Sequence, residues 1–481
     1  MNTLERNPIA DKENDVLLWQ VLNRYYFEPF RHKKICNEGS TRKTLELFIR
    51  GECPSYCTYC YLNRFGEKLY PCDCQSEEKI LENIDKILEF YVRQKFVCMI
   101  EMFSGECIVE GLMPKIWDKM YDCFSKVDME YRPNSILHPE NCDFVEYPEM
   151  IDMVQEYIDK FQRIGIRLSF SASVDGKYMD DNRTRVRSKE FYPNLFKFLM
   201  KNDFGCHPMV AAHGIEKWIQ NYDWWKSDEV PPHISDRLMM LEVRNDDWTK
   251  EKIQQYLKFI DHVSNYEYEH VHNCDNESFM ERIFCFDKYP RKGYDNIVLP
   301  CRLENRYPGL SCSGQSAMTL RVGDLGIALC HRTSYDKFIG GFFTLDKDGY
   351  INGVRAHNVP AYISMLAWDQ SCAPYCADCD FNQTCIGPCL GANYEATNSP
   401  FMIHPGVCDL MKAKTTFLIM KYLEMGLFDL GKQKHPNNET WLYWDKLINK
   451  FKRGMDSFEE RISDRIGNWR VRAEGGNFPE V

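Results

Sequence analysis

Three cysteines lie close together in the segment LELFIRGECPSYCTYCYLNRFG. Cys53, Cys57 and Cys60 have the spacing C-x3-C-x2-C and directly follow an apolar run that predicts a β-strand. Iron–sulfur clusters are held by cysteine thiolates, and a four-iron cluster has four irons to ligate. Three thiolates on one loop therefore leave one iron without a protein ligand. Because structural metal sites are closed, this pattern predicts a cluster that binds and reduces another molecule at its open iron.

The alternative for this loop is a zinc site. Cys72 and Cys74 follow the motif and would supply further thiolates, as in a zinc knuckle. The strand that precedes the motif and the alternating strands and helices that follow it favour a cofactor-binding loop.

A second group of cysteines lies in the C-terminal third of the chain. Its densest part, SCAPYCADCDFNQTCIGPCLGAN, contains the spacing C-x2-C-x5-C-x3-C. Eight thiolates are enough for two fully ligated four-iron clusters, and a zinc ribbon is the alternative. Cys372 also begins a C-x3-C-x2-C pattern, but no alternating strands and helices follow it. Besides Cys372, the group contains eight cysteines: Cys301, Cys312, Cys330, Cys376, Cys379, Cys385, Cys389 and Cys408.

The composition excludes several classes of protein. Of 481 residues, 44% are hydrophobic and 14% aromatic, which is not typical of a disordered chain. The net charge of −11 does not favour nucleic-acid binding. We find no apolar run long enough to cross a membrane and no secretory signal at the N-terminus. The 22 cysteines therefore indicate metal or redox chemistry in a reducing compartment, and we expect a cytoplasmic protein.

Residues 45–263 alternate short apolar runs with longer segments of helical period. Six strand–helix units of this kind predict an α/β fold with a parallel sheet and helices outside it. Six units are too few for a closed eight-stranded barrel, so we expect a partial (β/α)6 barrel with functional groups at the C-terminal ends of the strands. The predicted strands are Leu45–Arg50, Phe96–Met102, Ser135–Leu137, Ile166–Ser171, Pro208–Ala212 and Leu238–Val243. The predicted helices are Glu77–Arg93, Met113–Lys126, Pro148–Ile164, Tyr192–Lys201 and Thr249–Val263.

The rest of the chain divides by composition. Residues 1–44 contain an amphipathic stretch that predicts a helical extension, and residues 264–300 read as a connector. Residues 301–410 are rich in Cys, Gly and Pro, so we expect metal rather than a large core to order them. Residues 411–481 predict C-terminal helices.

The first cysteine loop resembles the signature of the radical S-adenosylmethionine (SAM) superfamily, because an aromatic residue, Tyr59, stands just before the last cysteine. The resemblance implies that the open iron binds the amino and carboxylate groups of SAM. It also implies reductive cleavage of SAM to methionine and a 5′-deoxyadenosyl radical, which abstracts hydrogen from a substrate. The cofactor supplies this chemistry, and the protein supplies position and exclusion of water.

Two further segments match that family. Ser104, Gly105 and Glu106 resemble its Gly-Gly-Glu element, which meets the methionine ammonium, with Ser in place of the first Gly. The segment FSASVDGKYMDDNRTR is similar to its Ser-x-Asp-Gly element. The resemblance there implies SAM contacts, with Ser173 on the ribose or carboxylate and an arginine on the carboxylate. The implied residues are Ser173, Asp175 and Arg185, with Arg183 as the competing arginine.

The C-terminal cysteines resemble the SPASM domain, the two-cluster extension of radical SAM enzymes that modify peptides and proteins. The resemblance implies one cluster on Cys301, Cys312, Cys330 and Cys389, and another on Cys376, Cys379, Cys385 and Cys408. The chain thus has three expected [4Fe-4S] clusters. It departs from the family in two ways. Gly326 lies four rather than five residues before the cysteine at 330, and the gap after Cys301 is long, so that this ligand is the least secure.

This resemblance implies a peptide-modifying radical SAM oxidoreductase that forms an oxidative modification or crosslink during maturation of a ribosomally made peptide. We expect a peptide or protein substrate, an electron donor such as flavodoxin or ferredoxin, and no nucleic acid or membrane partner. Sulfatase maturases carry an Asp base where this chain has His331, which is a candidate proton acceptor or a structural residue. Only 44 residues precede the first strand, which is short for a leader-binding domain.

Other functions stay open. Formylglycine formation of the sulfatase-maturase type and dehydrogenation of a small molecule are the enzymatic alternatives. A zinc or iron–sulfur module that binds proteins is the alternative outside enzymes.

Overall fold

The computed structural model describes residues 8–33, 36, 43–51, 53, 55–64, 75–103, 105–183, 187–236, 238, 240–271, 317–368, 376, 379, 389–424, 445 and 449. The chain divides into two compact units. The first unit comprises residues 1–173, 184–205 and 312–368, and the second comprises residues 174–183, 206–311 and 369–481.

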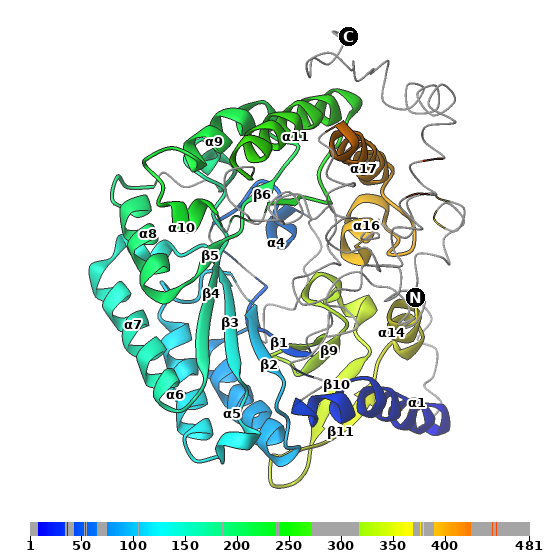
Figure 1. The fold of residues 1–481 in the computed structure, drawn as a ribbon. Helices are drawn as coiled ribbons and strands as arrows, with labels where there is room; N and C mark the ends of the chain where they lie inside the picture. The colour runs from blue at the N-terminus through cyan, green and yellow to red at the C-terminus, as the bar shows by residue number, and fades with distance from the viewer. Residues whose placement is uncertain are drawn as a thin grey trace. The chain divides into compact units, whose positions relative to one another are not determined.

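A predominantly parallel sheet forms the centre of the first unit (Figure 1). Its strand order is β11 (Ile351–Ala356), β10 (Gly341–Leu345), β9 (Gly326–Ala328), β8 (Ala317–Arg321), and then β1 to β5. All five residues of β1 are buried, as expected for a strand covered on both faces. The mixed α/β class with a parallel-dominated sheet is therefore confirmed. The first strands are β1 (Thr44–Phe48), β2 (Met99–Phe103), β3 (Ser135–Glu140), β4 (Arg167–Ala172) and β5 (Gly205–Cys206).

Helices cover the outer side of these strands (Figure 1). Ser76 caps the first of them, since its hydroxyl accepts a hydrogen bond from the Lys79 N–H at 3.3 Å. Ile80, Ile84 and Ile87 then recur at helical spacing and are buried. The sequence predicted each of these helices to within two residues at either end. They are α5 (Glu77–Arg93), α6 (Leu112–Phe124), α7 (Pro148–Arg163) and α8 (Phe191–Asn202).

The fifth and sixth predicted strands differ from expectation. The segment predicted as Pro208–Ala212 contributes only β6 (Met209–Val210), which pairs in parallel with β7 (Leu241–Glu242) in a separate two-stranded sheet. Pro208 has no N–H to donate, and the Met209 N–H donates to the Asp175 carboxylate at 2.8 Å. Local side-chain hydrogen bonding of this kind competes with the regular ladder, so the strand is short.

The cysteine-rich region also differs from expectation, because residues 317–356 extend the large sheet. β8 (Ala317–Arg321) pairs in parallel with β1, and β9 (Gly326–Ala328), β10 (Gly341–Leu345) and β11 (Ile351–Ala356) continue in antiparallel order. Arg321 is fully buried and pairs with Asp324 and Asp336. This ion cluster neutralises the buried guanidinium, so ordinary packing as well as metal can order the segment.

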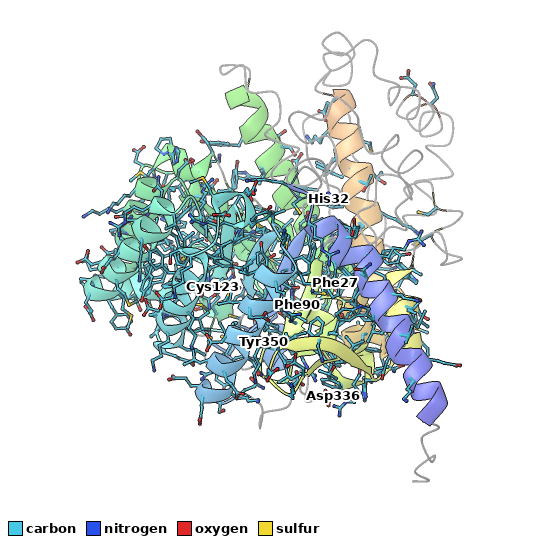
Figure 2. All side chains as sticks on the ribbon, turned by 90° about the horizontal axis from the view of Figure 1, so that it is seen from below. Phe27, His32, Phe90, Cys123, Asp336 and Tyr350 are labelled. Carbon is cyan, nitrogen blue, oxygen red and sulfur yellow. The ribbon has the colours of Figure 1, made fainter. Side chains whose placement is uncertain are left out.

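The N-terminal helix packs on the last strand of the same sheet. α1 (Pro8–Leu22) continues through a π-helical turn (Asn23–Phe27) into α2 (Glu28–Phe30). Asp15 accepts a hydrogen bond from the Ala356 N–H at 2.6 Å. The Phe27 ring contacts that of Phe90 at 5.6 Å between centroids (Figure 2). The predicted helical extension is thus part of the first unit.

The second unit is largely helical in its described part. Its helices pack through buried aromatic residues such as Trp218, Trp225 and Tyr256. Between α11 and α17, Lys421 pairs with Asp261 at 2.6 Å. The helices are α9 (Trp218–Trp225), α10 (Pro232–Ser235), α11 (Lys250–Val271), α16 (Leu390–Thr397) and α17 (Pro405–Glu424). No helix in the described ranges is long and apolar enough to span a membrane.

The remaining short elements connect these parts. They are α4 (Tyr61–Arg64) and α14 (Val359–Leu366), and the 3-10 turns Met129–Tyr131, Asp143–Glu146, Asp180–Arg183, Ile215–Lys217, His331–Thr333 and Asp336–Phe338.

Candidate functional site

The predicted cluster loop follows β1 and ends at α4. Cys57 is buried and Cys53 and Cys60 are half-buried. The Cys60 N–H donates to the Cys57 carbonyl at 3.0 Å, which closes a turn between the two. Burial, and to a smaller extent the neighbouring thiols of Cys57 and Cys53, raise the pKa of Cys60 to about 12. All three cysteines lie in the segment between the end of β1 and the start of α4. Tyr59 lies half-buried on the same loop.

This donor set fits an iron–sulfur cluster. Buried thiols ionise only beside positive charge, and iron supplies that charge to each thiolate. In the described part of the chain, no three His, Cys, Asp or Glu side chains converge on a single metal ion. A cluster makes no such demand, because its thiolates bind different irons.

Glu106 lies beside this loop, in the turn after β2. It is 1% exposed, and neither carboxylate oxygen receives a hydrogen bond from the described side chains. Burial raises its pKa well above the usual value, and the nearby carboxyl of Glu140 adds to the shift. Glu106 also raises the pKa of Cys53, after the larger effect of burial. Gly105 is half-buried in the same turn, and Ser104 lies outside the described residues.

The end of β3 contributes residues that sequence reasoning missed. Glu140 is buried, and burial raises its pKa to about 8. Asn141 donates from Nδ2 to the Ser55 hydroxyl at 3.2 Å, which connects this strand end to the cluster loop. Asp143 and Arg187 pair at 3.8 Å, both almost fully buried. The sequence signal was charge a few residues beyond the predicted strand Ser135–Leu137, which the structure extends to Glu140.

The Ser-x-Asp-Gly segment begins in the first unit, with Ser173, and continues in the second unit. The Ser173 N–H donates to the Glu140 carbonyl at 2.7 Å, within the first unit. In the second unit, the Asp175 carboxylate accepts two hydrogen bonds from Arg183, each 3.1 Å long. Its backbone carbonyl accepts further bonds from Asn221 and Trp225. Asp175 and Arg183 therefore already have partners in this structure.

Glycine at 176 is required by this packing. Gly176 has a φ of +118°, and a Cβ there would lie 2.5 Å from the Asn221 side chain. Arg185 lies outside the described residues.

His331 begins the 3-10 turn after β9. Its Nδ1 contacts the Glu46 carboxylate, and its ring stacks on Phe103 at 3.8 Å with an angle of 4° between the planes. The side chain is 23% exposed. Burial alone would raise the pKa of Glu46, but the imidazole and the Thr319 hydroxyl hold it below the usual value. Glu46 is a second residue that sequence reasoning missed, because it resembles an ordinary polar position in β1.

Five of the eight auxiliary cysteines lie in the described ranges. Cys330, in the first unit, is buried, and its N–H donates to the Thr333 hydroxyl at 3.2 Å. The second unit holds four half-buried cysteines: Cys376, Cys379, Cys389 and Cys408. The Cys379 N–H donates to the Cys376 carbonyl at 3.2 Å. Cys301, Cys312 and Cys385 lie outside the described residues.

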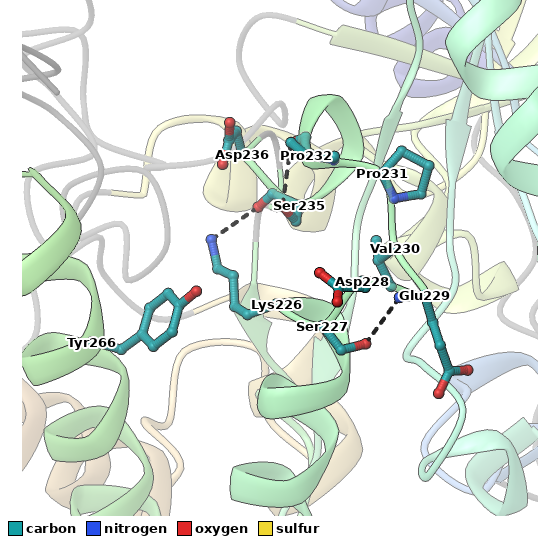
Figure 3. A pocket seen from close by; sticks show the side chains of 10 residues that line it. All are labelled: Lys226, Ser227, Asp228, Glu229, Val230, Pro231, Pro232, Ser235, Asp236 and Tyr266. Carbon is teal, nitrogen blue, oxygen red and sulfur yellow. Dashed lines mark hydrogen bonds between the residues drawn. The ribbon is translucent and has the colours of Figure 1, made fainter. Parts of the chain in front are cut away.

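The second unit also contains a pocket of about 380 Å³ (Figure 3). Lys226 donates from Nζ to the Ser235 carbonyl at 3.3 Å across it. Asp228, Glu229 and Asp236 give its lining an acidic character. None of the residues predicted to bind a cofactor or metal lines it.

Comparison with known proteins gives a structural likeness without a sequence match. No family model and no curated protein matches the sequence. Two solved structures of the anaerobic sulfatase maturase anSMEcpe, each with bound AdoMet, match with TM-scores of 0.52 and 13% identity. They cover 79% and 81% of this chain, and 98% and 99% of theirs. The chain therefore has the fold of a solved radical SAM maturase, which the resemblance of its cysteine motifs predicted.

Proposed function

We propose that this chain is a radical SAM enzyme that reductively cleaves S-adenosylmethionine and abstracts hydrogen from a peptide or protein side chain. The observation that carries the proposal is local. Three thiols share the loop after β1, and one of them, Cys53, lies near Glu106, a buried carboxylate that receives no hydrogen bond from the described side chains. A cluster with an open iron and a receptor for an ammonium group are the two features that binding of SAM requires.

Each of these residues has a separate role in the proposed function. Cys53, Cys57 and Cys60 hold the cluster. Glu106 and the adjacent Gly105 hold the methionine ammonium, and burial of this carboxylate strengthens its attraction for a cation. When bound, the cluster supplies the electron that cleaves SAM to methionine and a 5′-deoxyadenosyl radical. Tyr59, Ser104, Ser173 and Arg185 are proposed as further cofactor contacts on their sequence match alone.

We assign the auxiliary cysteines and His331 to the steps that follow abstraction of hydrogen from the substrate. Two further [4Fe-4S] clusters on the C-terminal cysteines would take up the second electron of a two-electron oxidation and pass it on. A flavodoxin or ferredoxin would reduce the first cluster. We propose an oxidative modification or crosslink in peptide maturation. Formylglycine formation is less favoured, because His331 stands where sulfatase maturases have Asp.

Anaerobic reconstitution tests the proposal. The full chain, supplied with iron and sulfide and then reduced, is expected to hold about twelve irons and to convert SAM to 5′-deoxyadenosine, as measured by liquid chromatography and mass spectrometry. Zinc in place of iron, together with intact SAM, would contradict it and favour a protein-binding zinc module.

We propose that the His331 side chain accepts a proton from the substrate. Its replacement by alanine is expected to lower product formation roughly 100-fold, the lower end of the usual effect of a general base, while release of 5′-deoxyadenosine continues. Both quantities are measured on a peptide that the unmodified enzyme turns over. His357→Ala is the matched control, because His357 is exposed. Equal product from the two variants would remove His331 from the mechanism.

A further inference from the structure

Three strands of the large sheet surround the imidazole of His331. Glu46 on β1 lies opposite Thr319 on β8, and Phe48 on β1 lies opposite Phe103 on β2. Side chains alternate between the two faces of a strand, so Glu46 and Phe48 share a face with each other and with their partners. The sheet therefore presents a carboxylate, a hydroxyl and an aromatic ring on the face where His331 lies.

Both oxygens of the Glu46 carboxylate are engaged on this face. One oxygen contacts Nδ1 of His331, and the other accepts a hydrogen bond from the Thr319 hydroxyl. An ionised carboxylate can only accept hydrogen bonds, so Nδ1 carries the hydrogen of its contact with Glu46. A neutral imidazole has a single N–H, and Nε2 therefore keeps its lone pair.

Aromatic contacts hold the plane of the same imidazole. Its ring stacks on Phe103 with centroids 3.8 Å apart and 4° between the planes, and the Tyr61 ring lies at 5.5 Å. Rotation that exchanged the two ring nitrogens would break the Nδ1 contact and this stack. The His331 side chain is 23% exposed and that of Glu46 only 2%, so a substrate can reach the imidazole but not the carboxylate.

We propose that Glu46 is a positioning residue, which holds His331 in the tautomer with hydrogen on Nδ1 and thereby makes Nε2 the proton acceptor. When Nε2 takes a proton from the substrate, the hydrogen on Nδ1 stays in place. The resulting imidazolium then lies against the buried carboxylate, which stabilises it. This inference rests on the proposed function, since it requires His331 to accept that proton.

Nuclear magnetic resonance tests the tautomer without a substrate. The reconstituted chain is labelled with 13C and 15N at histidine and measured at pH 8, and the signals of residue 331 are those missing from His331→Ala. Hydrogen on Nδ1 alone is expected in the unmodified chain. In Glu46→Gln, hydrogen is also expected on Nε2, because an amide can donate to Nδ1 as well as accept from it. Hydrogen on Nε2 in the unmodified chain overturns the inference.

Kinetics test whether Glu46 acts through His331, on a peptide that the unmodified chain turns over. Glu46→Gln keeps the shape of the side chain and is expected to lower kcat for product roughly 10- to 100-fold, the effect of losing one charge-assisted hydrogen bond. The KM for the peptide and the release of 5′-deoxyadenosine are expected to stay unchanged. In a chain that already carries His331→Ala, the same substitution is expected to have no further effect.

The controls separate the possible outcomes. Glu149→Gln removes an exposed carboxylate from the first turn of α7 and is expected to match the unmodified chain in every measurement. An equal loss of product from Glu46→Gln with and without His331 overturns the inference and indicates a packing role for Glu46. If the unmodified chain forms no 5′-deoxyadenosine from SAM, the proposed function itself fails, whichever tautomer the imidazole has.

Discussion

Replacing Cys53, Cys57 and Cys60 together by alanine is expected to lower the iron content of the reconstituted chain from about twelve to about eight atoms and to abolish formation of 5′-deoxyadenosine. The three thiols lie on one loop, and their removal takes away every proposed protein ligand of the first cluster. Without it, no reduced iron is available to cleave the sulfonium. Iron analysis and chromatographic detection of 5′-deoxyadenosine measure the two effects.

A single cysteine elsewhere provides the control for this experiment. Cys123 lies half-buried on α6, outside every proposed ligand set, and burial raises its pKa to about 11. Cys123→Ala is expected to keep the full iron content and normal cleavage of SAM. If the triple variant still produced deoxyadenosine at the rate of this control, the assignment of the first cluster would be wrong.

The largest effect on stability is expected at Lys414, in the second unit. Its ammonium pairs with the Glu242 carboxylate, and the two side chains are 5% and 3% exposed. Burial alone would raise the pKa of Glu242, but Lys414 and the Tyr256 hydroxyl lower it. Lys414→Ala leaves that carboxylate buried without its cation, which typically costs about 3–5 kcal/mol. Urea denaturation followed by circular dichroism measures the loss in the free energy of unfolding.

The acid dependence of this loss follows from the lowered pKa of Glu242. In the unmodified chain, the pair stabilises the fold above the ordinary carboxyl pKa and ceases to do so as pH falls through the lowered value. In Lys414→Ala the buried carboxyl becomes neutral at higher pH, so the difference between the two proteins narrows in acid. Lys412→Ala, on the same helix but half-exposed, is the control. Equal stability of the two variants would show that the pair contributes nothing.

The sequence alone determined the local features of this protein. The helix Glu77–Arg93 has the predicted bounds, because a serine cap and isoleucines at helical spacing specify it without reference to the rest of the chain. The cluster loop and Glu106 were predicted in the same way, from residue types and spacing directly after predicted strands.

Only the tertiary structure determined which distant side chains meet. Glu140 and Asp143 form no motif with Glu106, and they act on it because parallel strands end at the same edge of the sheet. Arg187 pairs with Asp143. Glu46 likewise acquires a role only because the turn after β9 brings His331 against it. The pairing of β8 with β1 joins residues more than 270 positions apart in the sequence. Such contacts depend on the register of strands that are remote in the sequence, which local periodicity does not encode.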